Sequence, residues 1–305
     1  MEGTAINDSR SQKAILLTAW VVILTTSLFK IVLQEVLHYQ LSEAQYLGIT
    51  ALIVIAGFAL TFAWKTIRPL RPFFGLFIVL VAAQWLFFTQ VDRVHTIQIR
   101  LRDPDFNTYM LAEQALKLLV TLTVIAYLLI INKKPEAFYL AMGDTAAPVE
   151  PVRWLGIKSG EKWTRLGSTL AIFLSLGTLA FLVIAGRPPI DIAIQALPFL
   201  PAVLLAAALN AFYEEMTYKA SFLSVLVDVV GKSQALLLMA AFFGILHYYG
   251  IPYGIVGVLM AGLLGWLLGK SMLETQGLFW AWFLHFLQDV LIFAFLAIGS
   301  ITPGG

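Results

Sequence analysis

The sequence predicts an all-α protein, a polytopic bundle of about nine transmembrane helices (eight to nine), and three observations support this fold class. First, 60% of the residues are hydrophobic and 12% are charged, whereas soluble domains are about half apolar and one quarter charged. Second, mean hydropathy is +0.85. Third, apolar segments of about 20 residues, long enough to cross a bilayer, recur along the chain. We therefore expect an integral, multi-pass protein of the cell membrane.

The predicted spans form two groups. They cover residues 14–37, 46–64, 73–89, 111–131, 166–186, 202–230, 234–249, 253–269 and 278–297. The stretch 190–230 is long for one span, and Pro198 and Pro201 are expected to break or kink it because proline disrupts a helix interior. A polar, proline-containing loop, 135–165, separates the four helices within 1–134 from the helices within 166–305.

The loop charges predict an orientation, because cytoplasmic loops are enriched in Lys and Arg. With the N-terminus inside, thirteen basic residues fall on the cytoplasmic side: Arg10, Lys13, Lys65, Arg68, Arg71, Lys133, Lys134, Arg153, Lys158, Lys162, Arg165, Lys232 and Lys270. Four fall outside: Arg93, Arg100, Arg102 and Arg187. The net charge of +2 is too small to favour nucleic-acid binding, and the absence of cysteine excludes thiol catalysis and disulfides.

Five ionisable residues interrupt the apolar segments of the C-terminal half: Glu214, Glu215, His247, His285 and Asp289. An ionisable side chain at the centre of a bilayer costs at least about 2.5 kcal/mol, so its presence indicates a function. Glu113 and Lys117 in the N-terminal half are spaced i, i+4, and we interpret them as a simple pair on a helix surface.

The first motif contains Glu214, Glu215 and Lys219. Successive residues of an α-helix point about 100° apart, so we expect only one of the two glutamates to face a given cavity. Lys219 lies one turn from Glu215, and the alternative to a catalytic role is a structural ion pair between these two residues.

The second and third motifs supply histidines. Glu214 lies 17 residues before Gly231, at a predicted turn, and His247 lies 16 residues after it. Equal distances from the turn of an antiparallel helix pair predict equal depth in the membrane. His285 and Asp289 share one helix face at i, i+4, where a carboxylate can orient an imidazole. Alternatively, His247 is an interfacial residue and His285 with Asp289 is an inert buried pair.

The order of Glu-Glu-x-x-x-Lys, Phe243-x-x-x-His247 and His285-x-x-x-Asp289 resembles the CPBP family, the CAAX prenyl protease 2 and Abi intramembrane endopeptidases. The resemblance covers about 198–295. It implies an intramembrane endopeptidase in which Glu214 and His247 activate a water, while His285 with Asp289 stabilises the oxyanion. The implied substrate is a membrane-associated or lipidated protein or peptide within the lipid bilayer, and no nucleic acid is expected.

The motifs depart from the family pattern at two positions. Lys219 replaces the usual arginine and keeps only a point charge. Asp289 stands where asparagine is frequent, and because an ionised aspartate cannot donate a hydrogen bond, we expect it to orient His285. The resemblance to the CAAX proteases also suggests access from the cytosol, whereas the charge count puts Glu214 towards the outer leaflet.

The cofactor is expected to be none or zinc. Glu214 or Glu215, together with His247 and His285, would supply three ligands and leave a fourth position for water. Two other function classes fit the same buried residues. A proton-coupled or ion transporter uses intramembrane Glu, His and Asp side chains as a relay, and a catalytically idle membrane scaffold or immunity protein would retain them without turnover.

Overall fold

The computed structural model describes residues 2–103, 105–131 and 133–301, and within these ranges every regular element is a helix apart from two isolated β-bridges. The N-terminal group consists of α1 (Glu2–Ile31), α2 (Glu43–Ala63), α3 (Arg71–Trp85), α4 (His95–Leu101) and α5 (Phe106–Ile130). The C-terminal group consists of α6 (Trp163–Gly186), α7 (Ile190–Gln195), α8 (Leu200–Glu214), the π-helix η8 (Glu215–Ala220), α9 (Ser221–Val230), α10 (Lys232–Leu246), α11 (Ile255–Thr275) and α12 (Phe279–Ile301).

The described part of the chain contains eight helical segments that are long and apolar enough to cross a membrane. A ninth predicted span corresponds to α10, which has only 15 residues. At 1.5 Å per residue it is about 22 Å long, shorter than a hydrocarbon core of about 30 Å. The predicted bundle of eight to nine spans is confirmed. The count is eight without α10 and nine with it.

The predicted break in the 190–230 stretch is confirmed. The short helix α7 and a 3₁₀ turn, Leu197–Phe199, precede α8, which begins at Leu200 with Pro201 in its first turn. Proline is tolerated there because the first N–H groups of a helix have no partner within the helix. From Leu200 the chain continues through η8 into α9 and ends at Gly231, whose φ of 81° lies in a region that favours glycine.

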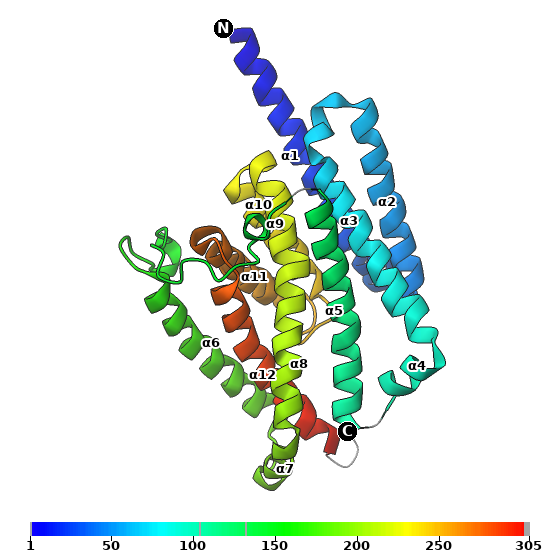
Figure 1. Ribbon diagram of the computed structural model, residues 1–305, viewed down its shortest axis with the longest axis vertical. Coiled ribbons are helices and arrows are strands. Elements are labelled where there is room, and N and C mark those ends of the chain that lie inside the picture. Colours follow the sequence, from blue (N-terminus) through cyan, green and yellow to red (C-terminus); the bar gives the residue numbers. More distant parts are fainter. Residues whose placement is uncertain (1, 104, 132, 302–305) are drawn as a thin grey trace.

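Long helices that are consecutive in the chain run in opposite directions, whereas some packed pairs, such as α5 with α8 and α6 with α12, run parallel (Figure 1). The start of α1, the α5–α6 loop and the α9–α10 turn lie at one end of the bundle, whereas α4, α7 and the end of α12 lie at the other. The start of α1 and the turn at Gly231 therefore lie at the same end of the bundle. This agrees with the loop charges, which put the N-terminus and Lys232 on the same side of the membrane.

The two groups of helices share one hydrophobic core. Phe222 of α9 stacks on Phe242 of α10 and meets the rings of Phe73 and Phe77 of α3 edge to face. Helix α8 packs between α5 and α12, and α10 packs on both α1 and α11. This arrangement surrounds the end of α8 with helices from both groups.

Candidate active site

The two neighbouring glutamates lie where the helix geometry changes. Glu214 is the last residue of α8, and Glu215 is the first residue of the π-helical turn η8. Such turns are rare and occur often at functional sites. Glu214 lines a cavity, whereas the Glu215 side chain is fully buried. The prediction that only one glutamate faces the cavity is therefore confirmed.

Both carboxylates nevertheless reach the same imidazole. Glu215 Oε1 lies 2.6 Å from His285 Nδ1, and Glu214 Oε2 lies 3.7 Å from His285 Nε2. The 2.6 Å contact is a hydrogen bond in which Nδ1–H donates to the carboxylate. This bond holds the ring so that Nε2 turns towards Glu214, which is how a carboxylate fixes the orientation of a functional histidine.

Lys219 supports Glu215, as the motif predicts. The Lys219 ammonium donates to Glu215 Oε1 at 2.7 Å, and neither side chain is exposed. The ammonium also lies 3.4 Å from the centre of the Phe243 ring. Since a buried charge is tolerated only with close partners, the carboxylate and the aromatic face together stabilise this lysine.

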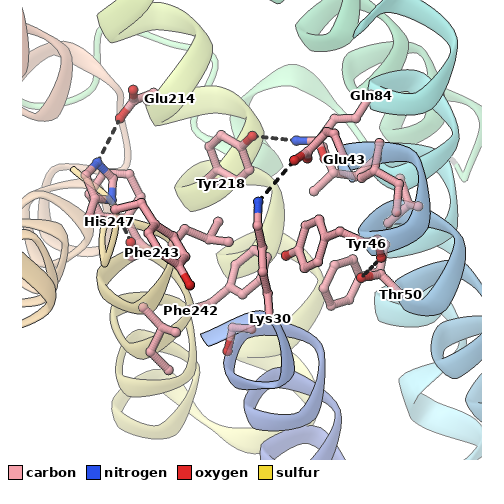
Figure 2. A pocket seen from close by; sticks show the side chains of 18 of the residues that line it. Lys30, Glu43, Tyr46, Thr50, Gln84, Glu214, Tyr218, Phe242, Phe243 and His247 are labelled. Atoms are coloured by element: carbon pink, nitrogen blue, oxygen red, sulfur yellow. Dashed lines mark hydrogen bonds and ion pairs between the residues drawn. The ribbon is translucent and has the colours of Figure 1, made fainter. Parts of the chain in front are cut away.

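His247 follows the last residue of the short helix α10. Its Nδ1 lies 2.8 Å from the carbonyl oxygen of Phe243, one turn earlier. A carbonyl can only accept, so Nδ1 carries the proton and a neutral His247 has its lone pair on Nε2. That nitrogen faces Glu214 Oε2 at 3.9 Å, which agrees with the equal depth predicted from the spacing about Gly231 (Figure 2).

Glu214 Oε2 lies between two imidazole nitrogens without a hydrogen bond to either. It is 3.9 Å from His247 Nε2 and 3.7 Å from His285 Nε2, and it is buried with no hydrogen-bond partner. Both separations exceed a hydrogen bond, and each is short enough for a water molecule to bridge Glu214 Oε2 and the imidazole nitrogen. The arrangement can therefore hold and polarise a single water.

Asp289 lies near the same nitrogen of His285 as Glu214 does, with Oδ1 at 3.6 Å from Nε2. This distance is too long for a hydrogen bond. The His285 ring donates its hydrogen bond to Glu215 instead, and Asp289, which was expected to orient the ring, lies beside it without a hydrogen bond. The local i, i+4 spacing favoured Asp289, whereas the residue that bonds to the ring lies on another helix.

Two residues that the sequence analysis did not assign to the site contact it directly. Asn210, one turn before Glu214, donates from Nδ2 to Glu214 Oε1 at 3.2 Å and to Asp289 Oδ2 at 3.0 Å. Lys117 of α5 donates to Asn210 Oδ1 at 2.9 Å and pairs with Glu113 at 2.8 Å. The predicted pair of Glu113 with Lys117 is therefore confirmed, but Lys117 also reaches Asn210, which a simple pair on a helix surface does not include. An amide at i−4 from a buried glutamate was the available signal for Asn210.

A cavity of about 340 Å³ extends from Glu214 and His247 to the N-terminal group. Figure 2 shows these two residues on one side and Lys30 with Glu43 on the other. Lys30 pairs with Glu43 at 3.1 Å across the α1–α2 connection. Helices α1, α2 and α3 thus supply the wall that faces the candidate catalytic residues.

The described residues contain no group of three or more His, Cys, Asp or Glu side chains arranged to hold a metal ion. The zinc alternative therefore lacks an assembled ligand set in this part of the chain. The side chains themselves offer a carboxylate, two imidazoles and a space for water between them.

One protein family matches the segment of the chain that contains the candidate site. The family model of the Rce1-like type II CAAX prenyl endopeptidases matches residues 196–291, which contain Glu214, His247 and Asp289. No curated protein and no solved structure matches the chain. Helices α1–α5 lie outside the matched segment. The chain is thus a multi-pass helical membrane protein whose residues 196–291 are similar to the Rce1-like type II CAAX prenyl endopeptidases, which confirms the resemblance to the CAAX protease family.

Proposed function

We propose that this protein is an intramembrane endopeptidase that hydrolyses a peptide bond of a membrane-associated or lipidated protein. The observation that carries the proposal is the unpaired Glu214 Oε2 between His247 Nε2 and His285 Nε2. The family match supports an intramembrane protease in general. The roles of individual residues and the choice of substrate are our inference.

In the proposed reaction, Glu214 accepts a proton from the bound water while the water oxygen attacks the peptide carbonyl carbon. His247 Nε2 accepts a hydrogen bond from the same water and fixes its position. The electron pair of the carbonyl bond moves to its oxygen. General-base assistance of this kind contributes about 10²- to 10⁴-fold to a rate.

His285 stabilises the resulting oxyanion. In its imidazolium form His285 donates from Nδ1–H to Glu215, and its Nε2–H points towards the space beside Glu214. A donor placed in advance at the developing charge is often the largest single contribution to catalysis. Glu214 next gives its proton to the leaving amine, the C–N bond breaks, and the carboxylate is restored.

The test uses the purified full-length protein and a fluorogenic peptide with a farnesylated CAAX end, the substrate class that the family name suggests. We expect cleavage by the wild type and none by the Glu214→Gln variant. Failure of the wild type to cleave this peptide would overturn the prenyl-peptide assignment. Proton flux into liposomes that carry the protein, without cleavage of any peptide, would favour the transporter alternative.

Two further measurements define the cofactor and the substrate. Metal content of the purified protein, together with activity after chelation, tests zinc directly. The Glu214→Gln variant keeps the binding cavity but does not cleave. Pull-down with this variant therefore identifies membrane proteins that bind as substrates and that the wild type would release after cleavage.

We also propose that the end of the bundle carrying the N-terminus faces the cytoplasm, because the predicted excess of Lys and Arg falls there. The natural chain has no cysteine, so single cysteines report on accessibility without background. We expect a membrane-impermeant maleimide added outside intact cells to label a Ser42→Cys variant and to leave a Lys65→Cys variant unlabelled. The reverse pattern would contradict this orientation.

A further inference from the structure

A chain of hydrogen bonds joins the N-terminal group to the candidate catalytic carboxylates. Lys117 of α5 donates to Asn210 Oδ1 at 2.9 Å, and Asn210 Nδ2 donates to Glu214 at 3.2 Å and to Asp289 at 3.0 Å. Asn210 is 5% exposed. Its amide group, with one carbonyl oxygen and two N–H donors, thus has a partner at each position.

Lys117 determines which way the Asn210 amide points. The carbonyl oxygen needs a donor, and the ammonium supplies one. A flipped amide would place its oxygen against two carboxylates and its N–H groups against a cation, which is electrostatically unfavourable in a buried site. The charge on α5 therefore directs both N–H groups to α8 and α12.

The amide in turn determines which oxygen of Glu214 is free. Asn210 holds Oε1, so Oε2 is left facing the two imidazole nitrogens. Without the bond from Asn210, the Glu214 carboxylate would be free to rotate. Its unbonded oxygen, Oε2, would then no longer be held towards the water. Misplacement of about 1 Å can cost roughly 10²-fold in rate.

We propose that Lys117, acting through Asn210, positions Glu214 for proton transfer, so that the N-terminal group supplies part of the machinery although it lies outside the matched family segment. The inference rests on the proposed function, in which Glu214 accepts the proton of water. Lys117 and Asn210 are positioning residues, since neither lines the cavity.

The central experiment compares Lys117→Met with Lys117→Arg in the farnesylated-peptide assay. We expect kcat of Lys117→Met to fall about 10- to 100-fold with little change in KM, because alignment of the carboxylate is lost while the cavity is kept. Lys117→Arg should recover a large part of the loss, because a guanidinium can still donate to Asn210 Oδ1.

Lys133→Met is the matched control. Lys133 also lies beside α5, but it donates to the carbonyl oxygen of Ser224 at 2.9 Å, away from the site. Its kcat should equal that of the wild type. Wild-type kcat in Lys117→Met, or an equal loss in Lys117→Met and Lys133→Met, would overturn the positioning role.

Glu214→Gln separates this inference from the proposed function. If the wild type cleaves no peptide, the proposed function itself fails, and if Glu214→Gln cleaves normally, Glu214 is not the general base. If Glu214→Gln is inactive and Lys117→Met is fully active, only the positioning role fails. Should Lys117→Met not fold, Asn210→Ser takes its place, since it also removes the bond to Glu214 Oε1, and full activity of that variant would be equally contradictory.

Discussion

The two groups of helices bury different kinds of polar side chain. Among the residues whose burial is described, the buried polar residues of α1–α5 carry only hydroxyl or amide groups: Thr26, Ser27, Thr50, Thr61, Gln114 and Thr121. The C-terminal group also buries charged or titratable side chains: Glu215, Lys219, Lys270, His285 and Asp289. Both groups contain helices long enough to cross the membrane. The difference in buried polar side chains therefore does not come from position in the membrane alone.

The partners of these side chains explain the difference. Thr26, Ser27 and Thr50 each donate to a carbonyl oxygen one turn earlier on the same helix. A hydroxyl satisfied in this way needs no residue from another helix. A buried charge needs partners that usually come from other helices, and such arrangements are retained where they serve a function. Buried charge with partners on more than one helix therefore marks the site, whereas buried hydroxyls, and the Lys270–Glu274 pair within α11, belong to ordinary packing.

The largest expected effect is on catalysis in the C-terminal group. Replacement of His247 by Ala removes the imidazole that faces Glu214 Oε2 and should lower kcat about 10²- to 10⁴-fold. Because His247 is partly exposed and makes its one short hydrogen bond to its own helix, the protein should stay folded. Hydrolysis rates and size-exclusion profiles in detergent measure both expectations. Near-normal cleavage would remove His247 from the mechanism.

The second effect is on stability. Lys219→Met leaves the fully buried Glu215 without its cation, and breaking a buried pair in this way costs about 3 to 5 kcal/mol. Unfolding of the variant in denaturant should show this loss. The double variant Lys219→Met with Glu215→Gln should recover part of it, because no charge is then left unpaired. A single variant as stable as the wild type would contradict the account of the buried pair.

A smaller effect is expected from the apolar core of the N-terminal group. Ile23 of α1 is fully buried, and Ile23→Val should cost about 0.5 to 1.5 kcal/mol through the loss of one methylene. Since the residue does not line the cavity, kcat should not change. Denaturant unfolding and the peptide assay on one preparation check the two statements together. A loss of kcat without a loss of stability would contradict this expectation. It would mean that packing around Ile23 influences the candidate site directly.

The smallest effect is expected at a buried hydroxyl. Thr26→Val keeps the shape of the side chain and removes only the bonds of its hydroxyl to the carbonyl oxygens of Val22 and Ile23. A side-chain hydrogen bond in a membrane bundle contributes about 0.6 kcal/mol on average, so the loss should be no larger. A cost comparable with that of Lys219→Met would abolish the distinction between the two groups.

The sequence contained enough information for the spans, the break at Pro198 and Pro201, and the shared depth of Glu214 and His247, because each depends on local composition or on spacing about one turn. The hydrogen bond from His285 to Glu215 and the one from Lys117 to Asn210 depend on how separate helices pack. These partners lie 70 and 93 residues apart, and no local pattern encodes that distance. The π-helical turn at Glu215 likewise carries no distinctive composition.

Peptide hydrolysis by purified Glu214→Gln, compared with Glu274→Gln, tests the central claim most directly. Glu274 is the matched control because, like Glu214, it is a glutamate with little exposed side chain, but it pairs with Lys270 and lies on α11 away from the cavity. If Glu214 activates the water, Glu214→Gln is folded and inactive. Glu274→Gln then has the wild-type kcat when the rate is expressed per folded protein. Full hydrolysis by Glu214→Gln would contradict the mechanism.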